Sequence, residues 1–95
     1  MATTETLPAE ETDTRTQRQP PYAVVLHNDD VNDMDDVVRV VHQLTPLNKE
    51  ESLLRTVEAH KSGVSLLLVT HRERAELYIE QFATYKLTVT AEPAG

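Results

Sequence analysis

The residues of this sequence that are best suited to a chemical role are the polar run Asn28-Asp29-Asp30 and one of the four histidines, His60. Carboxylate, amide and imidazole groups supply hydrogen-bond acceptors, and an ammonium group offers three donors and no acceptor. If the fold gathers these side chains, they form a site for a protonated amine, with about 1.5–3 kcal/mol from each charge-assisted hydrogen bond. Spacing does not show that they converge, because the same run is also typical of a turn that leads into a helix.

Other chemistries find little support. A calcium loop starting at Asp30 would put Met34 at a ligand position and Asp35 where glycine is needed. The four histidines form neither an HExxH pattern nor an i, i+4 pair, and the absence of cysteine removes thiolate ligands and thiol catalysis. Only two glycines and no G-x-S-x-G elbow are present. The sequence therefore predicts no metal, no cofactor and no enzymatic activity, although an acid–base pair of Asp30 and His60 is the enzyme alternative.

Charge and hydropathy narrow the class of partner. The formal net charge is −7, and an acidic surface repels phosphate backbones, so nucleic acid is not an expected partner. No stretch approaches the roughly 20 apolar residues of a membrane helix, and the N-terminus lacks a signal-peptide pattern. The expected location is therefore the cytoplasm, with no contact to a membrane.

Six elements must position the polar residues. Residues 1–20 are rich in Thr, Glu, Gln and Pro, which predicts a flexible, disordered N-terminal extension, and residues 21–95 form the folded domain. The apolar patterns predict strands and helices in the order β-α-α-β-α-β, at residues 22–26, 33–44, 48–62, 64–69, 71–85 and 87–91. We expect an α+β domain in which a three-stranded sheet carries helices packed on one face.

Helix signals refine this prediction. Asn48 with Glu51 resembles a capping box, and Gly63 is placed to end the same helix in a left-handed turn. Thr70 with Glu73 is predicted to cap the last helix. Expected inward-facing residues are Leu53, Leu54 and Val57 on the second helix, and Ala75, Ile79, Phe82 and Ala83 on the third.

Several of these residues together resemble a known family. Asn28-Asp29-Asp30, then Met34, then Val37-Val38-x-Val40 are similar to the N-D-D-x-x-x-M-x-x-V-V segment of ClpS adaptors. The stretch from Glu58 to Gly63 resembles the family's segment ending in H-x-x-G, and the element order agrees over about residues 20–93. The combination is more specific than the N-D-D run alone.

The resemblance implies a function. ClpS proteins are adaptors of the bacterial N-end rule pathway, without catalytic activity, that bind substrates (N-degrons) whose first residue is large and hydrophobic. They deliver these substrates to a ClpA or ClpC AAA+ unfoldase by docking on its N-terminal domain. The resemblance implies a monomer whose N-terminal extension is used by the unfoldase. The alternatives are a ClpS-like module that modulates the unfoldase without carrying substrates, and a ribosomal-stalk-like domain.

The resemblance also assigns roles residue by residue. The substrate α-amino group would be held by Asn28, Asp30 and His60, with a smaller share for Asp29. Met34 would form a wall against β-branched first residues. The remaining hydrophobic slot would be lined by Val37, Thr56, Ala59 and Leu87, with Asn32 at its rim. Thr56 and Ala59 stand where Met and Val are common in the family, which we expect to enlarge the slot and make it less apolar.

Overall fold

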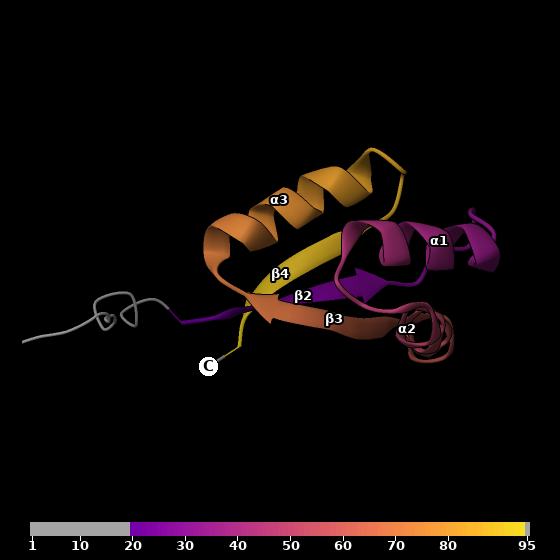
Figure 1. Ribbon diagram of the computed structural model, residues 1–95, viewed down its shortest axis with the longest axis horizontal. Coiled ribbons are helices and arrows are strands. Elements are labelled where there is room, and N and C mark those ends of the chain that lie inside the picture. Colours follow the sequence, from indigo (N-terminus) through magenta and orange to yellow (C-terminus); the bar gives the residue numbers. More distant parts are fainter. Residues whose placement is uncertain (1–19, 95) are drawn as a thin grey trace, which may run out of the picture.

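The computed structural model of this protein describes residues 20–94 and has the predicted order of elements (Figure 1). The elements are β2 (Tyr22–His27), α1 (Met34–Leu44), α2 (Lys49–Ser62), β3 (Val64–Thr70), α3 (Arg72–Ala83) and β4 (Val89–Pro93). Apart from Pro20, the predicted flexible extension lies outside the described residues. Within residues 20–94, no helix combines the length and apolar character needed to cross a membrane.

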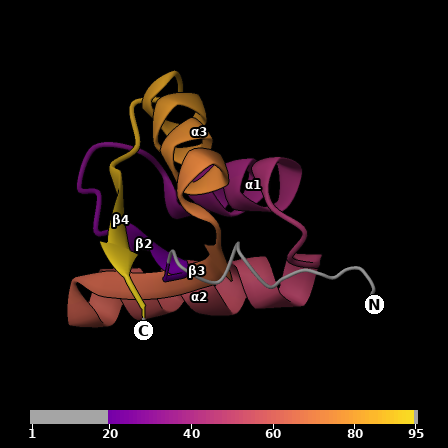
Figure 2. The same cartoon turned by 90° about the vertical axis from the view of Figure 1, so that its left-hand side faces the viewer.

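The three strands form one antiparallel sheet in the order β3-β2-β4, so the first strand of the chain lies in the centre. Leu26 of β2 stands opposite Ser65 of β3 and Val89 of β4. Helix α3 packs against all three strands, α2 packs against β2 and β3, and α1 packs against α2 and α3 (Figures 1 and 2). The predicted α+β architecture is confirmed.

The core lies between the sheet and the helices. On β2, Val24 and Leu26 are buried while Ala23 and Val25 are partly exposed, which is the alternation of a strand with one covered face. Helix α1 adds a buried stripe at the expected helical spacing, formed by Val37, Val40 and Val41. This packing fixes the end of β2 relative to α1, and the loop of residues 28–33 joins the two.

Helix α2 buries a different face from the predicted one. Leu53 and Leu54 are 47% and 66% exposed, whereas Ser52, Thr56 and Ala59 are buried. The prediction assigned the most apolar side chains to the interior. Packing against both α1 and β3 instead places small side chains on the inner face of α2.

The helix ends are partly as predicted. The capping box of α2 is confirmed, because Asn48 Oδ1 accepts from the Glu51 amide and Glu51 Oε1 accepts from the Asn48 amide. The predicted cap of α3 is wrong: Thr70 is the last residue of β3, and His71 occupies the N-cap position without a side-chain hydrogen bond to the helix.

The inward face of α3 was also only partly predicted. Ala75 and Phe82 are fully buried and Ile79 packs at the margin of the core. Tyr78 is buried in place of Ala83, which is exposed.

Candidate functional site

Two backbone hydrogen bonds fix the point where β2 ends. The His27 amide donates to the Thr88 carbonyl at 3.0 Å, and the Asn28 amide donates to the Gly63 carbonyl at 2.9 Å. Gly63 terminates α2, so the second bond ties the start of the 28–33 loop to the end of that helix. Asn28 and His60 are therefore brought to the same end of the sheet, although they lie far apart in the sequence.

Glycine is favoured at the end of α2 for a conformational reason. Gly63 has φ +94°, ψ −28°, and its amide donates to the Ala59 carbonyl at 2.8 Å. A left-handed φ is strained for residues with a side chain, so glycine is the common choice at this position of a helix end. His60 lies in the last turn of α2, one turn before this stop.

The loop that follows β2 is shaped around the Asp29 carboxylate. Its Oδ1 accepts from the Val31 amide at 2.8 Å and the Asn32 amide at 3.3 Å, and its Oδ2 accepts from the Asn32 side chain. Partial burial acts to raise the pKa of Asp29, but these hydrogen bonds outweigh it, so the pKa lies below its ordinary value. The loop therefore holds an ionised carboxylate in a fixed position.

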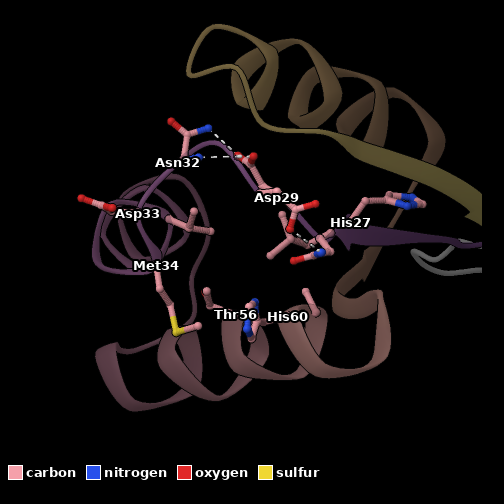
Figure 3. Close-up of a pocket in the computed structure, with 12 residues that line it drawn as sticks. His27, Asp29, Asn32, Asp33, Met34, Thr56 and His60 are labelled. Atoms are coloured by element: carbon pink, nitrogen blue, oxygen red, sulfur yellow. Dashed lines mark hydrogen bonds between the residues drawn. The ribbon is translucent and has the colours of Figure 1, made fainter.

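A cavity of about 230 Å³ opens between this loop, α1 and α2 (Figure 3). It collects all four residues that the sequence analysis assigned to the amine and five of the six assigned to the slot. Those residues are Asn28, Asp29, Asp30 and His60, and Asn32, Met34, Val37, Thr56 and Ala59. Leu87 instead lines a neighbouring hollow of about 200 Å³, which shares Asn32 and Val37 with the first.

The 28–33 loop supplies polar side chains to the cavity, α1 supplies apolar ones, and α2 supplies both kinds. Figure 3 shows Thr56 and His60 projecting from α2 toward the loop, and Met34 reaching from α1 toward α2. The Asn28 side-chain nitrogen donates to Asp30 Oδ1 at 3.2 Å, which leaves the Asn28 amide oxygen available as an acceptor. Asn28, Asp30 and His60 are exposed, as a solvent-facing rim requires.

Three lining residues were missed by the sequence analysis: Leu26, His27 and Asp33. The His27 ring turns away from the cavity and shares a 2.8 Å hydrogen bond with the Thr90 hydroxyl, and the Asp33 carboxylate also points outward (Figure 3). Leu26 is 1% exposed and forms part of the inner wall. The apolar run of residues 22–26 predicted a buried strand, but nothing in it marked Leu26 as a residue that lines a cavity.

Thr56 adds less polarity than its side chain suggests. Its hydroxyl donates to the Ser52 carbonyl at 2.8 Å, one turn earlier in α2, so its hydrogen is used inside the helix. The residue is 5% exposed. The wall formed by Val37, Thr56 and Ala59 is therefore close to apolar in character.

The volume and lining limit what the cavity can hold. It is smaller than the roughly 300–1,000 Å³ of pockets for drug-sized ligands, so it has room for one side chain and its backbone. Among residues 20–94, no three His, Cys, Asp or Glu side chains are grouped in a way that would hold a metal ion. The arrangement suits a small cationic group joined to an apolar one.

Comparisons with known proteins agree with one another. The model of the family described as ATP-dependent Clp protease adaptor protein ClpS matches residues 17–90. An adapter protein ClpS of Synechococcus elongatus is 39% identical over 90 residues, which cover 94% of this chain and 95% of that protein. A ClpS of Synechococcus sp. (strain CC9902) is 40% identical over 78 residues, 81% of this chain and 75% of the relative. The structure of Agrobacterium tumefaciens ClpS2 bound to L-phenylalaninamide superimposes with a TM-score of 0.76 at 26% identity, covering 81% of this chain and all of that one.

Proposed function

Because this chain belongs to the ClpS family of ATP-dependent Clp protease adaptors, we propose that it binds the free α-amino group and large hydrophobic first residue of N-degron substrates. It is an adaptor of the Clp protease and not an enzyme. The observation that carries the proposal is a single cavity lined by Asn28, Asp30 and His60 on its polar side and by Met34 and Val37 on its apolar side.

The polar side distinguishes a chain end from an internal peptide group. A free α-amino group has a pKa near 8 and is mostly cationic at neutral pH. It donates three hydrogen bonds, whereas an internal peptide nitrogen is neutral and donates one. The Asp29 and Asp30 carboxylates, the Asn28 amide oxygen and the His60 ring supply acceptors for all three donors.

The apolar side adds the contribution of the first side chain. Burial of a Leu or Phe side chain contributes about 1.5–3 kcal/mol. Together with the hydrogen bonds to the amine, and after the costs of association, this supports roughly micromolar affinity. The ligand of the Agrobacterium ClpS2 structure, L-phenylalaninamide, combines a free α-amino group with such a side chain. Neither half of the ligand would suffice alone.

Met34 adds selection by shape. Its side chain reaches from α1 toward α2 and forms one wall of the cavity (Figure 3). Val and Ile carry a branch at Cβ, next to the backbone, where they have little freedom to rotate away from a wall. We propose that Met34 disfavours these first residues relative to Leu and Phe.

The adaptor role implies a second partner. We propose that the chain, as a monomer, docks on the N-terminal domain of a ClpA- or ClpC-type unfoldase and that residues 1–20 assist delivery. Family membership and the Thr-, Glu- and Gln-rich composition of residues 1–20 support this. Deletion of residues 1–20 should leave peptide binding unchanged and slow the degradation of a reporter that begins with Leu.

Fluorescence anisotropy with peptides that differ only at their start tests the proposal. Peptides that begin with Leu or Phe should bind, while N-acetylated copies, which lack the charge and two donors, should bind at least about tenfold more weakly. A peptide that begins with Val controls for the shape of the slot. If the free and acetylated peptides bind equally or not at all, the alternative of a module that only modulates the unfoldase is favoured.

A further inference from the structure

Asn32 makes a set of contacts that a residue at the rim of a hydrophobic slot does not need. Its side-chain nitrogen donates to Asp29 Oδ2 and, at 3.3 Å, to the Lys86 carbonyl. Its backbone amide also donates to Asp29 Oδ1. A side-chain amide has two hydrogens on its nitrogen, and here both are engaged with groups on different segments of the chain.

The Lys86 contact reaches a turn with a constrained conformation. Lys86 has φ +63°, a left-handed value that is uncommon outside glycine. The turn is anchored on both sides, because the Lys86 amide donates to the Ala83 carbonyl at 2.9 Å and the Leu87 amide to the Phe82 carbonyl at 3.1 Å. The Lys86 carbonyl is thus presented at a fixed place, and Asn32 attaches the 28–33 loop to it.

The Asp29 contacts have a direct consequence for the amine. A carboxylate has about four lone-pair sites, and Asp29 accepts three hydrogen bonds from its own loop. One site remains for a donor in the cavity that Asp29 lines. The direction in which this free acceptor position points depends on how the carboxylate is oriented. The Asn32 side chain sets that orientation, because it donates to Oδ2.

We propose that Asn32 is a positioning residue for amine recognition: its side-chain amide clamps the Asp29 carboxylate and fixes the 28–33 loop to the Lys86 turn. The proposal rests on the proposed function, since it concerns the same amine. It assigns Asn32 to the polar half of the site. A rim residue that touched the bound side chain would instead affect Leu, Phe, Tyr and Trp unequally.

Binding of peptides that begin with each of these four residues tests the proposal in the full-length protein. Asn32→Leu keeps the size of the side chain and removes its donors. We expect it to weaken binding about tenfold, by a similar factor for all four peptides. Asn32→Thr retains one donor that can bond to Asp29 and should recover part of the loss. Val31→Ala is the matched control, because the Val31 side chain is 90% exposed and does not line the cavity.

A titration separates positioning from general damage to the fold. In Asn32→Leu, the NMR-measured pKa of the Asp29 carboxyl should rise, because a hydrogen bond to its charged form is lost. Besides Asp29, the titratable groups around the same cavity are His27, Asp30, Asp33 and His60, with Lys86 on the turn, and all remain present in the variant. Val31→Ala should leave the Asp29 pKa unchanged.

The outcomes distinguish the proposals. If wild-type protein does not prefer free over acetylated peptides, the proposed function itself fails. If wild type does show this preference, three results overturn the role of Asn32. These are unchanged binding by Asn32→Leu, a loss confined to one first residue, and no recovery in Asn32→Thr.

Discussion

Replacement of Gly63 by alanine tests the conformation on which the site is built. Gly63 stops α2 just after His60, and its carbonyl accepts from the Asn28 amide. Apart from its two neighbours in the chain, a Cβ atom added to Gly63 would meet no atom within 4 Å, so contact with the surrounding structure adds nothing to the cost. The whole effect of Gly63→Ala comes from the φ of +94°.

The magnitude follows from the backbone. A left-handed conformation costs an L-residue about 1–2 kcal/mol. Alanine has less freedom than glycine in the unfolded chain, which offsets about 0.4–1 kcal/mol. The net loss for Gly63→Ala is therefore about 1 kcal/mol, and for a domain of this size that lowers Tm by about 4–8 °C.

Thermal unfolding followed by circular dichroism measures this difference. Gly63→Asn should fall between wild type and Gly63→Ala, because asparagine tolerates left-handed backbone better than alanine. Lys61→Ala, an exposed position in the same helical turn, should change Tm little. Peptide affinity of the folded Gly63→Ala protein should stay within about twofold of wild type, less than 0.5 kcal/mol. An unchanged or higher Tm for Gly63→Ala would refute the left-handed stop of α2.

Further predictions concern the site directly. Asp30→Ala and His60→Ala should each weaken binding of a peptide that begins with Leu by about tenfold or more with Tm nearly unchanged, and unchanged affinity in both would contradict the assigned site. The pKa of Asp29 is lowered in the folded protein, so its contribution to stability is present above its ordinary value near 3.9 and is lost as pH falls through the folded value. In urea unfolding, Asp29→Asn should thus be less stable than wild type at pH 7, and the difference should shrink between about pH 5 and pH 2. Thr56→Val should leave peptide affinity within about twofold of wild type, because the Thr56 hydroxyl donates to the Ser52 carbonyl and not to a ligand. A tenfold loss of affinity would show instead that the hydroxyl faces the ligand.

The sequence predicted the elements that have strong local signals. The capping box at Asn48 and the left-handed stop at Gly63 are set by residues close to one another in the chain. Each has a short-range physical cause, namely a free helix amide or a positive φ. Such signals survive in the structure because tertiary packing does not compete with them.

The predictions from sequence were wrong where tertiary packing determined which side chains are buried and where an element ends. Leu53 and Leu54 fit an amphipathic pattern, yet the inner side of α2 is formed by Ser52, Thr56 and Ala59. Hydrophobicity alone does not reveal where a neighbouring element approaches too closely for a large side chain. At the end of β3, Thr70 remained paired with Tyr22 of β2, and this pairing outweighed its preference for a helix cap.

The candidate site was harder to predict than the fold, because its parts meet only through long-range contacts. The motif residues from Asn28 to Met34 and the segment ending at Gly63 pointed to side chains that line one cavity. Their convergence depends on the Asn28–Gly63 backbone bond, which no spacing in the sequence reveals. The hydrogen bond from the Asn32 side chain to the Lys86 carbonyl joins residues 54 positions apart, and no local sequence pattern predicts it.

The same residues form both the core and the wall of the cavity, which suits so small a domain to the side-chain recognition that we propose. Leu26, Val37 and Ala59 are at most 5% exposed and belong to the hydrophobic core, and they also line the cavity. A side chain that enters there continues the packing between β2, α1 and α2. Its apolar surface is removed from water by walls that folding has already fixed in place, so little further ordering of the protein is required. In the proposed function, the exposed polar rim of Asn28, Asp30 and His60 would then select which chain ends reach that wall.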